Sequence, residues 1–351
     1  MMKNDTRPKN DAISAPRDRS AARVLVVRYE SPYGGSVYDG MAAHALAGRH
    51  EVHEYLRTQI GSHGLRRYWK ALKVYRDLWR ALRRGTDYDV MIRTYDLALA
   101  PMPAGPLHVV IVHHLDFSAD RFHIPLTCLA GEFHRVLRGV AAIVVMADFW
   151  EQYFRRRGYT NVYRVNNGFD WSQFDSTPAE LEAFAREHHL TGKPILYLGN
   201  NTRGKGVDEA FAAVGDLDAH FVVTGKTPHP NPRIRSLYLN YRDYLRLLRC
   251  CAVVLTLSRF QEGWCRVAHE AMLCKTPVIG SGAGGMRELL AGGGQAVLTH
   301  LTAIRREVQT LLADPNRRRE IGERGYAYAS AFTVERTHRA WQDLVRSVLT
   351  R

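Results

Sequence analysis

The sequence places short apolar runs before glycine-containing turns and amphipathic stretches, and this order begins twice. In the first half, a β-branched run at 23–28 is followed by a glycine-rich turn at 31–36 and a helical stretch at 37–47. The same order starts again at 194–200, after a polar and proline-bearing stretch. A strand that leads through a tight turn into a helix is typical of parallel sheets wrapped by helices. The sequence therefore predicts two Rossmann-like α/β domains.

The predicted domain boundaries follow from this repetition. A chain of 351 residues is long enough for two such domains, and hence for a cleft between them. We expect an N-terminal Rossmann-like domain at 21–170, a linker at 171–192, a C-terminal Rossmann-like domain at 193–330, and at 331–351 an amphipathic helix that packs back across the domains. Later strands are expected at 90–92, 109–112, 142–146, 221–224, 252–257 and 277–279.

Composition excludes several classes of protein. An apolar fraction of 46% is typical of a globular protein rather than of a disordered one. No apolar run reaches the roughly 20 residues of a membrane-spanning helix, so we expect a cytoplasmic protein, either soluble or peripheral on a membrane. The five cysteines are odd in number and form no Cys-x-x-Cys pair, which predicts reduced thiols. Residues 1–20 are polar and charged, without the apolar stretch of a signal peptide, and are predicted to form a disordered basic tail.

The net charge of +14 predicts attraction to polyanions. Residues 64–84 carry Trp, Tyr and Leu at helical spacing, interleaved with Lys and Arg. This pattern fits a helix at the surface of an anionic membrane, and it fits equally well a helix packed on the N-terminal domain with a solvated basic face. Nucleic acid is not an expected partner, because no known binding module is present.

Two segments of the second half have the composition of a phosphate and sugar site. The strand that ends at Gly199 is followed by Asn200, Arg203 and Lys205 in a glycine-containing loop, where backbone and cations could hold a phosphate. Further on, Glu262 lies after a predicted strand and Glu270 lies eight residues later along a helix, at most about 12 Å away. One carboxylate could accept from a hexose and the other from a ribose diol.

The run from Glu262 to Glu270 continues into Pro277-Val278 and then Gly284-Gly285. This string resembles the signature of the retaining glycosyltransferases of family 4, which have a Glu-x7-Glu motif, a Pro-Val strand and a Gly-Gly turn. The resemblance extends from about residue 21 to the C-terminus. It implies the GT-B fold, in which two Rossmann-like domains with parallel sheets face an interdomain cleft, and it implies a sugar transfer from a UDP- or GDP-sugar to a hydroxyl acceptor.

The resemblance also implies roles for individual residues. Glu270 would bind the ribose hydroxyls, Glu262 the transferred sugar and Lys205 the diphosphate, while His113 would lie beside the reacting sugar. Together with His113, the catalytic set would be Glu262, Lys205 and Arg203. Donor-binding positions would be Gly34, Gly35, Gly199, Asn200, Arg203, Lys205, Glu262, Gly263, Trp264, Glu270, Gly284 and Gly285. The segment His50-Glu51-Val52 resembles the usual end of the family's first helix.

One position departs from the family pattern. The family usually has Arg immediately after the glycine at 199, whereas this chain has Asn200. We expect Arg203 to replace it. The resemblance further implies front-face attack with retention, with no cofactor and no metal, because cationic side chains would stabilise the leaving diphosphate. The pairs Asp87/Asp89 and Asp216/Asp218 are therefore interpreted as turn residues rather than as metal ligands.

The acceptor that the resemblance implies is a lipid-linked or cell-surface glycan precursor. Two alternatives stay open. One is another enzyme on the same fold, such as a nucleotide-sugar epimerase or a sugar phosphorylase, and the other is a degenerate, non-catalytic binding protein. Release of nucleoside diphosphate from a donor would separate them.

Overall fold

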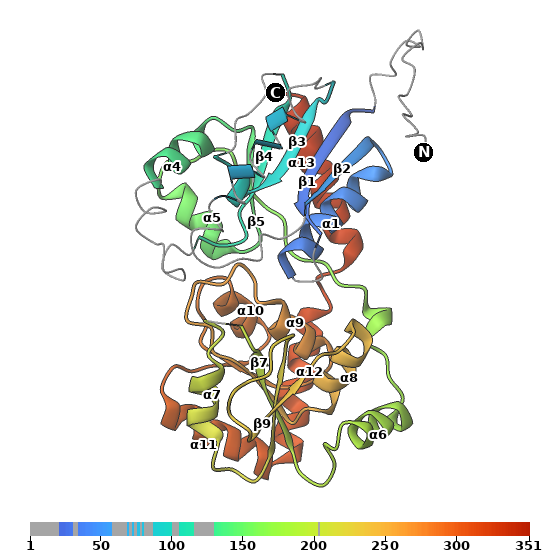
Figure 1. Cartoon of the computed structure of the whole chain (residues 1–351), viewed down its shortest axis with the longest axis vertical. Coiled ribbons are helices and arrows are strands. Elements are labelled where there is room, and N and C mark those ends of the chain that lie inside the picture. Colours follow the sequence, from blue (N-terminus) through green and yellow to red (C-terminus); the bar gives the residue numbers. More distant parts are fainter. Residues whose placement is uncertain are drawn as a thin grey trace, which may run out of the picture.

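The computed structural model describes residues 21–30, 34–57, 69, 72–73, 76–77, 79–80, 87–99, 105–115, 130–202 and 204–351. Arg203, the predicted tail at 1–20 and most of the predicted basic helix at 64–84 therefore lie outside the described residues. Within these ranges the chain forms two α/β halves, which are seen one above the other in Figure 1.

The N-terminal half is a parallel sheet of six described strands in the order β2-β1-β3-β4-β5-β6. Its strands are β1 (Arg23–Tyr29), β2 (Glu51–Arg57), β3 (Val90–Thr94), β4 (Leu107–Ile111), β5 (Ala142–Val145) and β6 (Val162–Arg164). Its helices are α1 (Gly34–Ala47), the short 3-10 helix η1 (Tyr95–Leu97), α4 (Ala130–Arg138) and α5 (Asp148–Arg155). Strands β3 and β5 are buried throughout, as expected for a parallel sheet covered on both faces.

The C-terminal half repeats this plan in the order β12-β11-β10-β7-β8-β9. Its strands are β7 (Ile195–Asn200), β8 (His220–Thr224), β9 (Ile234–Leu237), β10 (Val253–Thr256), β11 (Val278–Gly280) and β12 (Ala296–Val297). Its helices are α7 (Val207–Val214), α8 (Tyr241–Cys250), α9 (Arg266–Leu273), α10 (Met286–Gly292), α11 (Leu301–Ala313) and α12 (Pro315–Ala329). The predicted fold class is thus confirmed, with all strand pairs parallel among those described.

Strand β2 was missed by the sequence analysis. We expected His50 to Val52 to end the first helix, but α1 ends at Ala47 and Glu51 begins β2. The strand lies at the edge of the sheet and most of its side chains are exposed. An edge strand with so few buried positions needs few apolar residues, so it gives no clear alternating pattern.

The stretch expected as a linker contains two helices, the 3-10 helix η2 (Trp171–Phe174) and α6 (Pro178–Glu187). Thr177 caps α6 and forms a capping box with Glu180. Arg246 on α8 donates to Glu180 at 2.6 Å, so α6 is held against the C-terminal half.

The final helix, α13 (Val334–Leu349), packs on the N-terminal half, as its position beside α1 in Figure 1 shows. The buried Trp341 meets the ring of Tyr38 on α1, with centroids 6.1 Å apart. The side-chain amide of Gln342 donates to the carbonyl of Ala45 at 2.9 Å. Strand β1 and the final helix α13 therefore belong to the same half.

The two passages of the chain between the halves lie side by side. The N–H of Phe169 donates to the carbonyl of Phe332 at 3.0 Å, and Phe169 forms a parallel bridge with Thr333. The hydroxyl of Thr337 donates to the carbonyl of Asn166 at 3.1 Å. Gly168 lies so close that a Cβ there would be 2.6 Å from Oγ1 of Thr337. Small size at this position is therefore required for the crossing.

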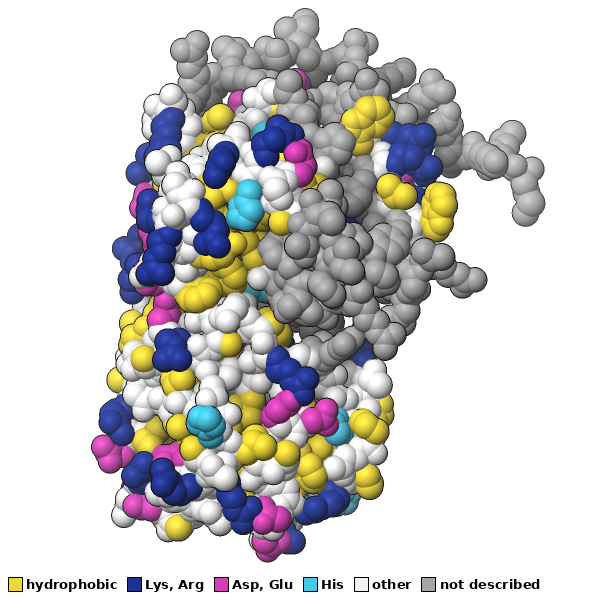
Figure 2. All heavy atoms as spheres, turned by 90° about the vertical axis from the view of Figure 1, so that its left-hand side faces the viewer, with side chains coloured by type: hydrophobic (Ala, Val, Ile, Leu, Met, Phe, Trp, Pro, Cys, Tyr) yellow, Lys and Arg dark blue, Asp and Glu magenta, His cyan; other side chains and the backbone are white. Residues whose placement is uncertain are grey.

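Within the described part of the chain, no helix is both long and apolar enough to cross a membrane. The space-filling view in Figure 2 shows Lys and Arg side chains on both halves of one face, and in the lower half they are interspersed with acidic ones. On this face the positive charge of the described residues is thus spread out rather than gathered into one patch.

Candidate active site

The candidate site lies where the carboxyl ends of the two sheets approach each other, which is where open α/β sheets bind ligands. His113 follows β4 of the N-terminal half, and the loop with Glu262 follows β10 of the C-terminal half. The two meet directly, because a Cβ on Gly263 would clash with the carbonyl oxygen of His113. The backbone of His113 and the loop with Glu262 and Gly263 are thus in contact.

Lys205 and Glu262 form an ion pair, with Nζ and Oε1 2.7 Å apart. The Glu262 side chain is 8% exposed, and it also accepts from the hydroxyl of Ser258 at 2.5 Å. The ring of Phe260 lies 4.7 Å from Nζ of Lys205, which adds a cation-π contact. A partly buried lysine that is held in place beside a carboxylate is suited to meet a phosphate and a sugar hydroxyl together.

The backbone around Glu262 is held by the predicted Gly-Gly turn. The N–H of Gly285 donates to the carbonyl of Glu262 at 2.9 Å, and Glu262 forms a parallel bridge with Gly284. Gly284 has a φ of +66°, and a Cβ there would overlap the Glu262 backbone. We expected the amides of this turn to bind the donor. In this structure the Gly285 amide instead supports the Glu262 loop.

The N-terminal half also contacts this loop from α5. The indole N–H of Trp150 donates to the carbonyl of Glu262 at 2.9 Å. The N–H of Asp148, at the start of α5, donates to Oε2 of Glu288 at 2.7 Å. Because Ala147, the N-cap residue of α5, offers no capping side chain, Glu288 caps that helix from the opposite half.

Glu270 lies on α9 and is almost completely buried, at 4% exposed. It accepts from Arg266 at 2.9 Å and from the hydroxyl of Tyr241 at 3.2 Å. Burial raises the pKa of Glu270, while Arg266, Tyr244 and Tyr241 oppose that rise. Tyr241 and Tyr244, in the first turn of α8, face Glu270.

His113 is paired with Asp39 on α1, with Nε2 and Oδ1 2.9 Å apart. The two side chains are 14% and 3% exposed. Burial lowers the pKa of His113, but the Asp39 carboxylate and, more distantly, Asp96 outweigh it, so the pKa lies above its ordinary value. The Tyr38 ring meets the imidazole edge-on at 5.7 Å. The Asp39 carboxylate thus favours the protonated imidazole, whose second N–H can donate to an oxygen of a bound ligand.

The predicted glycines of the N-terminal half begin α1 at this site. A Cβ on Gly35 would lie 3.5 Å from Nε2 of His113. A Cβ on Gly34 would lie 3.0 Å from Cδ of Arg266 in the C-terminal half. The absence of a side chain at Gly34 thus lets α1 approach Arg266 closely, whereas a Cβ on Gly35 would make an ordinary contact with His113. We expected the helix to begin at Val37, and it begins one turn earlier.

The predicted phosphate loop follows β7. Gly199 and Gly206 have φ of +106° and +76°, and a Cβ on Gly206 would clash with the backbone of Leu257. Asn200 ends the strand, and its side-chain oxygen accepts from the hydroxyl of Thr202. The proposed replacement of the usual arginine by Arg203 stays a prediction, since Arg203 lies outside the described residues.

The expectation for Trp264 is corrected by the structure. Its side chain is 2% exposed, and its indole N–H donates to Nδ1 of His269 at 2.9 Å. Nε2 of His269 in turn lies 3.1 Å from the carbonyl of Ala329, to which it donates. Burial lowers the pKa of His269 to about 3, so the ring is neutral. The tryptophan is therefore part of the core, and its indole does not line the cleft.

The two acidic pairs have structural partners. Asp89 accepts from the N–H of Arg23 at 2.7 Å, and Asp216 pairs with Arg305. Asp218 pairs with Lys193. Across the described ranges there is no group of three or more His, Cys, Asp or Glu side chains arranged to hold a metal ion. Metal independence itself stays a prediction.

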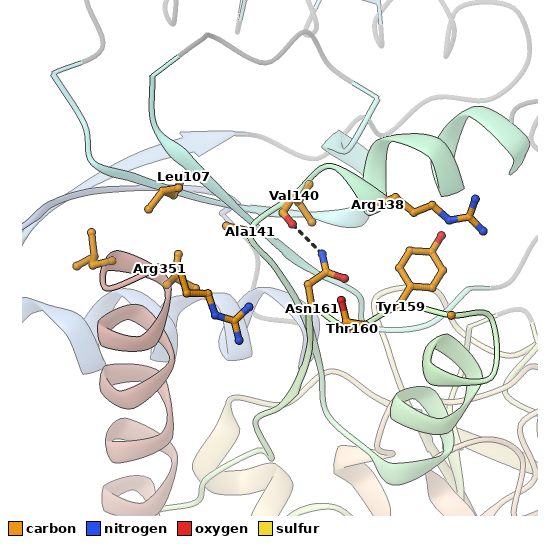
Figure 3. Close-up of a pocket in the computed structure, with 11 residues that line it drawn as sticks. Leu107, Arg138, Val140, Ala141, Tyr159, Thr160, Asn161 and Arg351 are labelled. Carbon is orange, nitrogen blue, oxygen red and sulfur yellow. Dashed lines mark hydrogen bonds between the residues drawn. The ribbon is translucent and has the colours of Figure 1, made fainter.

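A separate cavity of about 540 Å³ lies at the amino ends of strands in the N-terminal sheet (Figure 3). It is lined by Leu107 at the start of β4, by residues just before β5 and β6, and by the exposed Arg138 and Arg351. In Figure 3, Tyr159 lies beside Arg138, whose guanidinium is 5.5 Å from the ring centre. The cavity and His113 therefore lie at opposite ends of the strands, since His113 follows the carboxyl end of β4.

Sequence reasoning missed three residues of the site: Asp39, Phe260 and Arg266. Asp39 lies on α1 just after the glycine-rich turn at 31–36, and nothing in that turn marks it as a partner of His113. Arg266 and Phe260 lie within or next to the Glu-x7-Glu string, but nothing in the string itself shows which way they point. Their partners in the N-terminal half become visible only once the two halves are packed together.

Two Rossmann-like halves that face each other with the carboxyl ends of their parallel strands define the GT-B fold. This is the fold class of this protein. Residues 180–328 match the family described as glycosyl transferases group 1. The match includes Lys205, Glu262, Glu270 and the Gly-Gly turn.

Known proteins show similarity to the whole fold and to part of the sequence. The chain is 28% identical over 197 residues to the alpha-maltose-1-phosphate synthase of Mycolicibacterium smegmatis. The aligned region covers 47% of this chain and 51% of that protein. The chain spans about half the length of the curated relatives it matches. Among solved structures, Anabaena HepE in complex with UDP and glucose has a TM-score of 0.77 at 17% identity, covering 93% of this chain and 100% of that one. Sucrose-phosphate synthase from Thermosynechococcus elongatus has a TM-score of 0.78 at 19% identity, covering 95% and 100%.

Proposed function

We propose that the protein is a retaining glycosyltransferase that moves a sugar from a nucleoside diphosphate sugar to a hydroxyl acceptor. The observation that carries this proposal is the pairing of Lys205 with Glu262 in the loop after β10, directly against His113 of the opposite half. The backbone of His113 thus contacts the loop that carries the carboxylate of this pair. The buried Glu270 on the following helix supplies a second acceptor of hydroxyl hydrogen bonds.

The comparisons support the donor class. The family match covers the segment with Lys205, Glu262 and Glu270. HepE has been solved in complex with UDP and glucose, and also with UDP-glucose. We therefore propose UDP- or GDP-sugars as donors, in which Glu270 accepts from the ribose diol and Glu262 from the hexose.

The chemistry follows from the charges at the site. When the glycosidic bond to phosphate breaks, negative charge develops on the β-phosphate and positive charge on the sugar. Lys205 can then donate to the phosphate, since its side chain is 31% exposed and reaches the cleft surface. Helix α9 adds the N–H groups of its first turn, for its N-cap Cys265 makes no side-chain cap.

We propose front-face attack with retention. Glu262 is held by Lys205 and Ser258, so it serves the sugar hydroxyls rather than acting as a nucleophile. The departing phosphate takes the proton of the acceptor hydroxyl. The imidazole of His113, whose protonated form Asp39 favours, donates to an oxygen of the transferred sugar and thereby fixes its orientation.

A panel of UDP-, GDP-, ADP- and TDP-sugars tests this function. Release of nucleoside diphosphate is followed with and without lipid and saccharide acceptors, and with and without a metal chelator. We expect one donor to be consumed, release that the chelator does not change, and a product whose anomeric configuration matches that of the donor by NMR. Release from none of the donors contradicts the transferase proposal, and an epimerised donor without release supports the epimerase.

We further propose that the acceptor is lipid-linked and that the protein works at the cytoplasmic face of an anionic membrane. The supporting observation is that Trp69 and Leu72 are 74% and 60% exposed although they are large and apolar. The described basic neighbours Lys73, Arg76 and Arg80 are exposed as well. Exposed Trp and Leu beside basic residues are typical of surfaces that enter the headgroup region of anionic lipid.

Vesicle flotation tests this second part. A variant with Trp69→Ser and Leu72→Ser should lose most of its flotation with vesicles that contain anionic lipid. Tyr238, 71% exposed in the C-terminal half, provides the matched control, and Tyr238→Ser should float like the wild type. Equal flotation of both variants and the wild type contradicts the membrane proposal without affecting the transferase proposal.

A further inference from the structure

Arg266 is the first residue of α9 in the C-terminal half, yet its side chain contacts the N-terminal half. Its Nη1 lies 3.3 Å from Oδ1 of Asn167, and its guanidinium lies 4.5 Å from the centre of the Phe169 ring. Its Cδ lies 3.0 Å from the position that a Cβ on Gly34 would take. A single charged side chain of the donor half is thus held by three features of the opposite half.

The same guanidinium also pairs with Glu270. Its Nη2 donates to Oε1 at 2.9 Å, and the two side chains are 16% and 5% exposed. A carboxylate buried to this degree is ionised only if a cation or several donors compensate for the lost water. Burial raises the pKa of Glu270, and Arg266 is the strongest of the groups that oppose this rise.

The remaining groups around Glu270 are neutral. Tyr241 and Tyr244 face it from α8, and burial raises the pKa of both hydroxyls. Burial raises the pKa of Tyr197 on β7 and of Cys274 after α9, and the charge of Glu270 raises both further, so these groups are also neutral. Among the described groups that shift the pKa of Glu270, Arg266 is therefore the one cation.

We propose that Arg266 is a positioning residue for the nucleotide: it pairs with the Glu270 carboxylate and orients it toward the ribose, while Asn167 and Phe169 hold the guanidinium in place. This inference rests on the proposed function, in which Glu270 accepts from the ribose diol. One side chain thus makes both the Glu270 contact and the contacts with Asn167 and Phe169, where the chain crosses between the halves.

Calorimetry tests the binding part. UDP, GDP, ADP and TDP are titrated into the wild type, and the tightest of them is then titrated into variants from pH 5 to pH 9. Arg266→Leu should weaken binding roughly 10- to 100-fold at pH 7, since the buried carboxylate loses its cation. Binding should also fall off at a higher pH than in the wild type, because a higher pKa of Glu270 means that the carboxylate is protonated earlier as the pH falls.

Two further variants separate charge from contact. Arg266→Lys keeps the charge but loses the planar fork, so it should restore the pH profile with only part of the affinity. Asn167→Ala keeps the Glu270 pair and should cost less affinity than Arg266→Leu. Arg186→Leu is the control, because Arg186 pairs with Glu182 at the same spacing on the exposed face of α6, and it should bind like the wild type.

A direct readout distinguishes failure of this inference from failure of the proposed function. The pKa of the Glu270 carboxyl is measured by NMR on protein labelled with ¹³C at glutamate Cδ, with Glu270→Gln assigning the signal. Arg266→Leu should raise that pKa whether or not any nucleotide binds. An unchanged pKa, or unchanged affinity and pH profile, overturns the role of Arg266. A raised pKa without nucleotide binding in the wild type instead overturns the proposed function.

Discussion

The carboxylate of Asp39 and the imidazole of His113 form a buried pair, with Oδ1 and Nε2 2.9 Å apart, although 74 positions separate them in the chain. The pair joins α1 to the loop after β4, at the carboxyl ends of the strands, where the C-terminal half makes contact. One nitrogen of His113 is thus committed to Asp39, which leaves Nδ1 as the other polar group of the ring.

Replacing Asp39 by Asn should lower the pKa of His113. Asp39 raises this pKa, so the imidazolium is present below the raised value and is lost as the pH rises through it. Without the carboxylate the ring loses its proton at a lower pH, and the alkaline limb of donor turnover should move down by about one pH unit or more. NMR titration of His113, assigned with His113→Gln, measures this directly. Glu51→Gln is the control, since Glu51 pairs with His53 at the start of the edge strand β2, and a His113 pKa unchanged by Asp39→Asn would sink the assignment.

Glu270→Ala and His113→Ala should affect different kinetic constants. Glu270 is proposed to hold the nucleotide, so its loss should raise KM for the donor and weaken nucleotide binding roughly 10- to 100-fold. His113 is proposed to orient the reacting sugar, so its loss should lower kcat with little change in nucleotide affinity. Steady-state kinetics and calorimetry on both variants check the difference. If both changes affect binding and turnover equally, the assigned roles are wrong.

Gly263→Ala should keep the two halves apart. A Cβ at this position would clash with the carbonyl oxygen of His113, so the contact seen here cannot form without a shift of one half. Turnover should fall by about 100-fold or more, because misplacement of about 1 Å is costly in an active site. Small-angle scattering should show a larger radius of gyration. Gly48→Ala is the control, as no atom lies within 4 Å of its added Cβ, and a compact, active Gly263→Ala variant would refute the prediction.

Trp341→Ala should destabilise the N-terminal half. Trp341 on α13 is fully buried and packs beside Tyr38 of α1, so its truncation leaves a large cavity. We expect the free energy of unfolding to fall by about 3–5 kcal/mol in urea. Trp171, 45% exposed, is the comparison, and Trp171→Ala should cost far less. Similar losses for both variants would show that α13 is not integral to the N-terminal half.

The segment that carries Glu262 and Glu270 could be predicted from the sequence because its residues lie close together in the chain. Glu262 and Glu270 lie on one loop and the helix that follows it, and their strand, turn and helix appear in order along the chain. Repetition of that order in both halves likewise predicted the two sheets. Strand β2 escaped prediction because its exposed edge position needs few apolar residues.

The contacts between the halves could not be predicted. Arg266 and Asn167 are 99 positions apart, and Trp150 and Glu262 are 112 apart. Neither pair leaves a periodic or compositional signal, since each depends on how two separately folded sheets are packed. Trp264 shows the opposite error, because membership of a motif suggested a ligand contact for a side chain that the core required.

The hydrogen bond between Phe169 and Phe332 has a mechanical consequence. The segment that leaves the N-terminal half and the segment that returns to it are bonded to each other, so the two crossings form one connected link between the halves. A movement that pulled these segments apart would break this bond and the neighbouring contact of Thr337 with Asn166.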